Sequence, residues 1–186
     1  CGRSRDVPHR RGLGVAPGWG SMIMGGINVT SVEPVSSAGK PEAARYDEAR
    51  LLAAHDGAEP VAKEACLAIG DRLDTDIEAG NRGGYDSLAV LTGVTNPHEL
   101  MFAPEHLRPT YIAKDLTGLN EPAPEVVHEA GAWSCRDVQA CVDGDRLYVT
   151  DITSVDGLRA ACAAMWDAAD RGHSVDGMIV PEFRIA

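Results

Sequence analysis

Three aspartates, Asp71, Asp74 and Asp76, follow a short apolar run at residues 65–69. A continuous apolar run bounded by a glycine is typical of a strand buried on both faces of a parallel sheet. Ligands of open α/β sheets bind beyond the carboxyl ends of the strands, so we expect Asp71 to project into such a site. Carboxylate oxygens suit Mg²⁺, and a metal site at Asp71 is therefore one interpretation. A solvated loop capped by aspartates is the other.

Lys40 lies in the sequence Gly39-Lys40-Pro41, at the predicted start of a helix. A cation at this position opposes the positive end of the helix dipole unless an anion such as phosphate or carboxylate lies nearby. Lys40 is thus a candidate anion ligand, with a lone surface lysine as the alternative. Asp76 stands at the start of the next predicted helix, where a carboxylate favours the dipole and can orient neighbouring groups.

Strands and helices are predicted to alternate around these residues. Strands are expected at residues 65–69, 87–92 and 110–113, and helices at 41–55, 77–82 and 97–101, with residues 71–76 as a loop. The apolar face of the first helix is expected to use Ala44, Leu51 and Leu52, with Tyr46. Alternation with short connections indicates a doubly wound α/β fold.

A second module is predicted after a Pro-rich linker at residues 120–125, and its strands and helices do not alternate as in the first part. Residues 126–186 are expected to form a small α+β domain. Its elements are a hairpin, 138–142 with 147–150 around Asp143-Gly144, a helix capped by Ser154 and ended by Gly172, and a last strand at 175–180.

Composition excludes several classes of protein. The 186 residues carry a formal net charge of −11, which argues against sequence-independent binding to nucleic acid. No apolar run reaches the ~18 residues of a membrane helix. The five cysteines form no Cys-x-x-Cys pair, so a zinc site is not expected and a cytoplasmic location is. The oligomeric state cannot be read from the sequence.

Residues 1–12 differ from the rest of the chain because they carry four arginines and only one acid. The chain also starts at Cys1, and these residues contain no apolar core of a secretory signal. We therefore expect a disordered or non-native basic arm ahead of residues 13–119.

The strings GKPEAARYDEA, LAIGDRLDTDIEAGNRGGYDSLAVLTGVTNPHEL and LRPTYIAKDLTGL resemble the second half of haloacid-dehalogenase-like (HAD) phosphatases. The resemblance is to the NagD-like subgroup, including actinobacterial glycerol-phosphate phosphatases, and it covers residues 12–119. It implies a partial HAD-like (Rossmannoid) parallel sheet core that includes the end of the cap. It also implies that Lys40 balances charge at the phosphoryl group, that Asp71 is a Mg²⁺ ligand, and that Asp76 supports both.

The resemblance implies a Mg²⁺-dependent phosphatase acting on a small phosphorylated metabolite through an aspartyl-phosphate. The nucleophilic Asp-x-Asp-Gly motif of the family is not found, so the chain is expected to supply the lysine and metal-binding half and to be incomplete, whether as a fragment or as a frameshifted product. Asp143-Gly144-Asp145 is better explained as a hairpin turn than as this motif.

Two alternatives remain open at this stage. One is a non-catalytic regulatory or binding remnant of a HAD protein. The other is acetyltransferase-like activity of residues 126–186, which would correspond to the acetyltransferase-like (GNAT-like) tail of some similar phosphatases. Residues 153–157 are a poor pyrophosphate loop, so a structural or regulatory annex is the preferred interpretation of that module.

Overall fold

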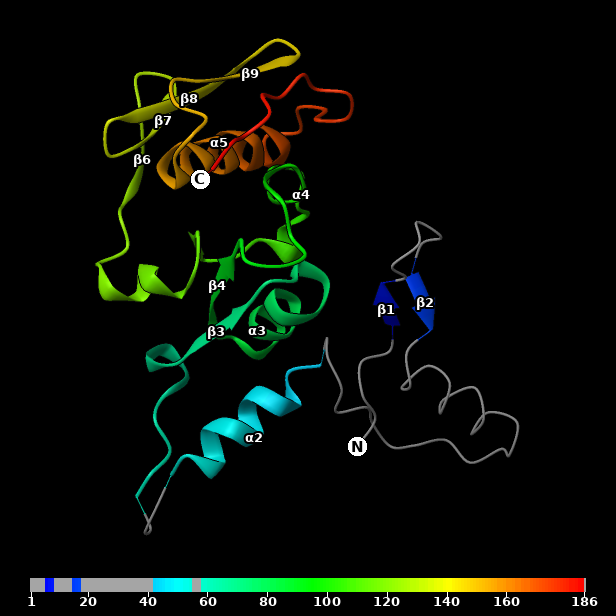
Figure 1. The fold of residues 1–186 in the computed structure, drawn as a ribbon, viewed down its shortest axis with the longest axis vertical. Coiled ribbons are helices and arrows are strands. Elements are labelled where there is room, and N and C mark those ends of the chain that lie inside the picture. The colour runs from blue at the N-terminus through cyan, green and yellow to red at the C-terminus, as the bar shows by residue number, and fades with distance from the viewer. Residues whose placement is uncertain (1–5, 9–14, 18–41, 55–57, 186) are drawn as a thin grey trace. The chain divides into compact units, whose positions relative to one another are not determined.

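A three-stranded parallel sheet carries the segment with the three aspartates. The computed structural model describes residues 6–8, 15–17, 42–54 and 58–185 (Figure 1). The strands are β3 (Leu67–Gly70), β4 (Asp86–Val90) and β5 (Tyr111–Ala113), in the order β3-β4-β5. Leu88 of β4 faces Tyr111 of β5 in parallel register. The α/β class expected from the sequence is confirmed.

Helical segments join these strands. They are α2 (Ala44–Leu52), the 3₁₀ turn η1 (Lys63–Ala65), the π-helical turn η2 (Leu73–Ile77), α3 (Glu78–Gly83), α4 (Pro97–Met101), and the 3₁₀ turns η3 (Glu105–Leu107) and η4 (Leu116–Asn120). Helix α3 lies very close to β3, because a Cβ on Gly80 would come within 2.7 Å of the Ala68 Cβ. Only glycine allows this approach without displacing the strand.

The start of α4 and the end of α3 confirm the capping residues predicted from the sequence. Asn96 accepts a hydrogen bond from the backbone N–H of Glu99 at 3.0 Å, and the Glu99 side chain accepts from the Asn96 N–H at 3.2 Å. This capping box, with Pro97 in the first turn, starts α4. Helix α3 ends at Gly83 and is capped by Gly84, whose φ of 70° is in the left-handed region.

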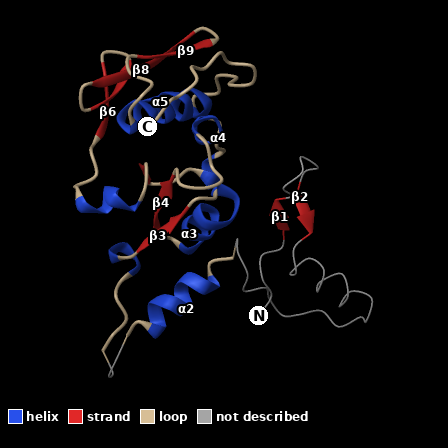
Figure 2. Ribbon diagram, viewed as in Figure 1, coloured by secondary structure: helices blue, strands red, loops and turns tan. Residues whose placement is uncertain are grey.

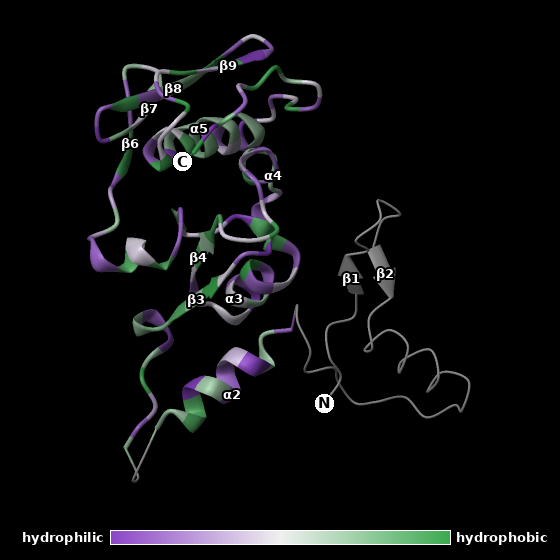
Figure 3. Ribbon diagram, in the orientation of Figure 1, coloured by the Kyte–Doolittle hydropathy of each residue, from purple (hydrophilic) through white to green (hydrophobic). Residues whose placement is uncertain are grey.

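Three expectations for this part of the chain were wrong. Residues 73–77 form a π-helical turn rather than a loop. The strand expected at 65–69 is present as Leu67–Gly70, but it is not buried on both faces, since Leu67 is 37% exposed. The predicted apolar face of α2 is not covered, since Leu51 and Leu52 are 52% and 70% exposed. These two leucines lie at the hydrophobic end of α2, which is green in Figure 3.

The C-terminal part of the chain forms a four-stranded antiparallel sheet with one long helix (Figure 2). The strands, in the order of the sheet, are β6 (Val126–Glu129), β7 (Ala132–Cys135), β8 (Val138–Asp143) and β9 (Arg146–Val149). The β8–β9 hairpin is confirmed, with Asp143 paired to Arg146 and Gly144 at a φ of 60° in the turn. The β6–β7 hairpin was not predicted.

Helix α5 (Val155–Asp170) supplies the core of this module. Ser154 caps it as predicted, accepting a hydrogen bond from the Gly157 N–H at 3.1 Å. Leu158, Cys162 and Met165 are buried on the face that packs on β7, β8 and β9. The strand expected at 175–180 is wrong, because this segment makes only an isolated bridge between Arg146 and Ile179.

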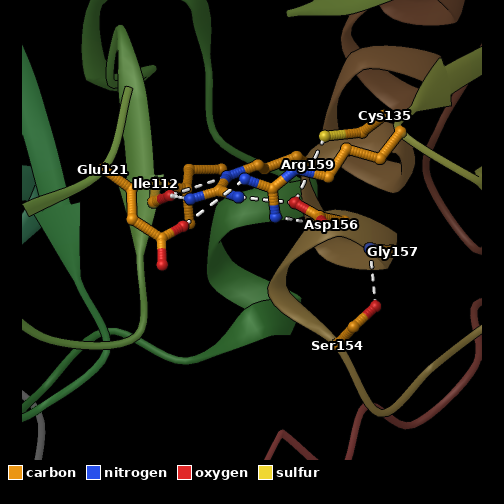
Figure 4. Close-up of polar contacts among 8 residues, drawn as sticks. Ile112, Glu121, Cys135, Ser154, Asp156, Gly157 and Arg159 are labelled. Carbon is orange, nitrogen blue, oxygen red and sulfur yellow. Dashed lines mark hydrogen bonds and ion pairs between the residues drawn. The ribbon is translucent and has the colours of Figure 1, made fainter. Parts of the chain in front are cut away.

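A cluster of charged groups ties α5 to the parallel sheet (Figure 4). The Arg159 guanidinium donates to the main-chain carbonyl of Ile112 in β5 at 2.9 and 2.6 Å, and it pairs with Asp156. Arg136 pairs with the other oxygen of Asp156 at 3.1 Å. Close by, Trp166 of α5 donates its indole N–H to the Leu100 carbonyl at 3.0 Å. The C-terminal helix is therefore bonded directly to the end of β5 and to α4.

The chain divides into two compact units, Cys1–Ile69 with Asp74–Ser87, and Gly70–Leu73 with Leu88–Ala186. The domain boundaries expected from the sequence stay a prediction. In the basic arm, β1 (Asp6–Pro8) pairs antiparallel with β2 (Val15–Pro17), and the rest of residues 1–12 lies outside the described residues. No helix in the described part of the chain is long and apolar enough to cross a membrane.

Candidate active site

Asp71 lies directly after β3, and the turn after β4 fixes its position. The Val94 N–H donates to Oδ2 of Asp71 at 3.2 Å, and the Thr95 N–H donates to the main-chain carbonyl of Asp71 at 2.9 Å. Two successive backbone donors thus anchor both the carboxylate and the backbone of one residue.

Gly93 makes this arrangement possible. A Cβ on Gly93 would lie 1.7 Å from Oδ2 of Asp71 and 2.7 Å from its Cγ, so no other residue fits beside the carboxylate in this position. The sequence analysis did not assign a role to Gly93. The only signal available was its place just after a strand that neighbours the strand leading to Asp71.

Asp76 belongs to the π-helical turn η2, immediately before α3, and is 7% exposed. Its main-chain carbonyl accepts a hydrogen bond from the Tyr46 hydroxyl of α2 at 3.3 Å. Isolated π-helical turns within helices are found frequently at functional sites, because they move a side chain out of the regular helical register. The predicted helix-start aspartate is therefore buried, and it is placed next to α2.

The position of Tyr46 beside Asp76 affects the pKa of its hydroxyl. Burial raises the pKa of Tyr46 to about 12, and the negative charge of Asp76 contributes to the same shift. The hydroxyl therefore stays protonated and remains a hydrogen-bond donor across the physiological pH range. The hydrogen bond between the two residues places Asp76 beside α2, the helix that follows Lys40 in the sequence.

A second set of contacts fixes α2 against the end of α3. Asp47 accepts a hydrogen bond from the Tyr85 hydroxyl at 2.6 Å and forms an ion pair with Lys63 at 2.8 Å. Lys63 also donates to the Gly83 carbonyl at 2.9 Å. The hydrogen bonds from Lys63 and Tyr85 lower the pKa of Asp47, so this carboxylate is charged at neutral pH. Its role is to hold the helix in place.

The structure describes two of the three residues that were predicted to share the site, Asp71 and Asp76. Lys40 lies outside the described residues, Asp71 belongs to the second unit, and Asp76 belongs to the first. The structure brings Asp71 to the Gly93–Val94 turn and brings Asp76 to Tyr46. The predicted convergence of Lys40, Asp71 and Asp76 stays a prediction.

The fit of Mg²⁺ depends on Asp71. Within residues 42–54 and 58–185, no group of three or more His, Cys, Asp or Glu side chains is placed to hold a metal ion. Mg²⁺, however, is usually bound by one or two carboxylates, with waters and phosphate oxygens completing its shell. The Asp71 carboxylate, with its Oδ2 anchored by one backbone N–H, fits the role of a single protein ligand in such a shell.

The buried cysteines do not offer an alternative nucleophile. Burial raises the pKa of the Cys135 thiol to about 11, with Asp156 adding to the shift, and burial also raises the pKa of Cys162. Both thiols are therefore protonated at neutral pH, whereas the thiolate is the reactive form.

Comparison with known families gives a match over residues 37–119, to the family described as HAD-hydrolase-like. D-glycerol 3-phosphate phosphatase of Mycobacterium tuberculosis is 37% identical over 174 residues, which are 87% of this chain and 44% of that protein. Phosphoglycolate phosphatase 2 of Arabidopsis thaliana is 34% identical over 117 residues, 62% of this chain and 36% of that protein.

Among solved structures, glycerol phosphate phosphatase from M. tuberculosis in complex with magnesium matches with a TM-score of 0.62 at 34% identity. The match covers 89% of this chain and 46% of that chain. Its complex with calcium matches with a TM-score of 0.61 at the same identity. The chain thus spans less than half the length of these relatives.

Proposed function

Residues 37–119 belong to the HAD-like hydrolase family, and from this premise we propose that the chain provides the lysine and metal-binding half of a Mg²⁺-dependent phosphatase. The observation that carries the proposal is the Asp71 carboxylate, anchored at the end of β3 by the turn after β4. A carboxylate held at the carboxyl edge of a parallel sheet is suited to binding a ligand there.

Each candidate residue has a role in this proposal. Asp71 holds Mg²⁺, which supplies positive charge opposite the phosphoryl oxygens of the substrate. Lys40 places a second positive charge at the same group. Asp76, buried beside Tyr46, orients Lys40 and supports the metal site from the start of α3. Positioning and charge neutralisation supply most of the catalysis in phosphoryl transfer.

The nucleophile comes from outside these residues in our proposal. The 186 residues contain no Asp-x-Asp-Gly sequence, and Asp143-Gly144-Asp145 forms the turn between β8 and β9. An aspartate supplied from elsewhere would form the aspartyl-phosphate, which water then hydrolyses. We therefore expect the isolated chain to bind the metal weakly and to show no turnover.

The substrate class in our proposal is a small phosphate monoester of the sugar-phosphate or glycerol-phosphate type. Its support is the similarity to the D-glycerol 3-phosphate phosphatase, which extends over most of this chain. The similarity to a phosphoglycolate phosphatase supports the same coarse class, since both names describe a small phosphorylated organic molecule.

The metal site is tested by titrating the chain with Mn²⁺, a paramagnetic substitute for Mg²⁺, and recording backbone amide NMR spectra. We expect the signals of residues 70–72 and 93–95 to broaden first. Asp71→Asn retains an oxygen that can accept from Val94 but removes the negative charge, so it should abolish this broadening. Asp74→Asn, at an exposed position of the same segment, is the matched control. Broadening that survives in Asp71→Asn contradicts the assignment of Asp71.

The proposal that the nucleophile lies outside these residues is tested by measuring release of p-nitrophenol from p-nitrophenyl phosphate with Mg²⁺. We expect no turnover above background from the chain alone. Robust turnover that Asp71→Ala abolishes would contradict the view that the nucleophile lies outside the chain, while supporting Asp71 as the metal ligand.

A further inference from the structure

A cavity of about 470 Å³ lies in the C-terminal module, between the antiparallel sheet and the C-terminal half of α5. This volume is within the range of small-molecule sites, about 300–1,000 Å³. The residues that give the cavity its chemistry are His128, Trp133, Cys141, Asp167, Arg171 and His173. They belong to the second unit and lie outside the family match at residues 37–119.

One wall of the cavity is aromatic. His128 and Trp133 are directly opposite each other on β6 and β7, and their ring centroids are 5.0 Å apart. Trp133 is only partly exposed, and its indole N–H points at Asp167 of α5 with a separation of 3.4 Å. The two rings are inclined by 30° to each other, and a planar ligand can pack against either of them.

The end of α5 contributes an acid that is already paired, Asp167, and an exposed guanidinium, Arg171. Oδ1 of Asp167 pairs with Nε of Arg171 at 3.0 Å, while Oδ2 faces the Trp133 indole. This pairing offsets the Asp167 charge and part of the Arg171 charge. The Arg171 side chain is 65% exposed and uses Nε in its ion pair with Asp167. Its two terminal nitrogens can therefore donate to a further acceptor.

His173 also lines the cavity. Its Nε2 lies 2.9 Å from the Gly144 carbonyl in the β8–β9 turn, and its backbone N–H donates to Ala168 at 2.9 Å. These two contacts join the end of α5 to the hairpin, so this wall is held by the fold before any ligand arrives. Preorganised groups lose less entropy on binding.

We propose that this cavity binds a small planar organic anion, with the ring against His128 and Trp133 and the anionic group on Arg171. The guanidinium fork matches the geometry of a carboxylate or phosphate oxygen pair. Asp143 and Asp145 flank Gly144 at one rim, and their charge opposes an anion, so the affinity is modest, in the roughly millimolar range. The site is independent of the proposed phosphatase function.

The test uses three probes: 2-naphthoate, its neutral amide 2-naphthamide, and acetate. Binding is followed through the indole N–H signal of Trp133 in ¹H–¹⁵N NMR spectra, identified with a Trp133→Phe variant. We expect 2-naphthoate to shift this signal in a saturable manner and to bind about tenfold more tightly than 2-naphthamide, the ratio typical of one charge-assisted contact. Acetate, which lacks the ring, should bind more weakly than 2-naphthoate.

Variants assign the effect to Arg171. In Arg171→Gln the difference between 2-naphthoate and 2-naphthamide should disappear, and in Arg171→Lys it should be partly kept. Arg184→Gln, an exposed arginine of the same unit that does not line the cavity, should leave the difference unchanged. The proposal is overturned if the Trp133 signal does not shift up to the solubility limit, or if the acid and the amide bind equally well to the unmodified chain.

Discussion

The segment from β3 to α4 and the module from β6 to α5 are organised in opposite ways. The first segment contains a recognisable aspartate motif, and its critical contacts are a few backbone hydrogen bonds to Asp71. The second contains no motif for chemistry, yet it holds the largest helix of the described chain and a dense buried face on it. Both are packed, since Ile77 and Leu100 of the first segment are fully buried, so the two regions differ in their motif and not in the presence of a core.

This difference teaches that a chemical motif can be positioned by a few contacts at the surface of a packed segment. Asp71 is positioned by Gly93 and Val94, which are both exposed. The C-terminal module instead contributes packing and the bond from Arg159 to β5. Substitutions in the two regions should therefore have different consequences: loss of stability in the module, and loss of metal binding in the aspartate segment.

The largest effect on stability is expected for Leu158→Ala in α5. Leu158 is fully buried, so truncation leaves a cavity and should lower the free energy of unfolding by about 2–5 kcal/mol. Leu52→Ala at the exposed end of α2 is the matched control, with an expected change within about 0.5 kcal/mol. Urea unfolding followed by circular dichroism measures both. Equal losses would contradict the role of Leu158 in the core of the module.

Arg159→Met should have the next largest effect. The substitution retains much of the aliphatic length but loses two hydrogen bonds to the Ile112 carbonyl and the pair with Asp156. Hydrogen bonds that involve a charged group contribute about 1.5–3 kcal/mol, and we expect a loss of that size. Arg184→Gln, at an exposed position, is the control. If Arg159→Met leaves the free energy of unfolding unchanged, α5 is held to β5 by apolar contacts alone.

Gly93→Ala separates stability from site geometry. The added methyl collides with Oδ2 of Asp71, so the carboxylate or the turn must move, at a cost of about 1–3 kcal/mol. We expect the Mn²⁺ broadening near residues 70–72 to be lost even where the variant is fully folded at 25 °C. Thr92→Ala, on the exposed neighbouring residue, should retain it. Unchanged Mn²⁺ binding in Gly93→Ala contradicts the role given to this turn.

Tyr46→Phe is expected to have the smallest effect at neutral pH, a loss of about 1 kcal/mol for one hydrogen bond. The pKa of Tyr46 is raised in the folded protein from 10.0 to about 12, so the folded state favours the protonated hydroxyl. Its contribution is fully present below pH 10 and is lost as pH rises toward 12. The stability of the unmodified chain should therefore fall more steeply over this range than that of Tyr46→Phe.

The parts of the fold that could be predicted are those specified by neighbouring residues. Asn96-Pro97 and Ser154 announce helices because capping depends on residues close in sequence. The β6–β7 hairpin was missed because its turn contains Ala130 with a φ of 51°, a conformation that alanine rarely adopts. Its sequence therefore lacks the usual glycine or asparagine signal at that position.

Contacts between distant residues explain what could not be predicted at the site. The sequence indicated Asp71 and Asp76, but nothing local connects Asp71 to Gly93 or Asp76 to Tyr46. Likewise, Leu51 and Leu52 have helical apolar spacing, yet a periodic pattern says nothing about whether a partner surface exists.

The hairpins of the C-terminal module also have a consequence for the order of folding. Strands β6 to β9 pair only with their neighbours in sequence, through turns of two residues, so these contacts close short loops and form on a microsecond timescale. The parallel pairing of β4 with β5 must instead wait for the intervening segment to collapse. The antiparallel meander is therefore expected to form early, before β4 and β5 come together.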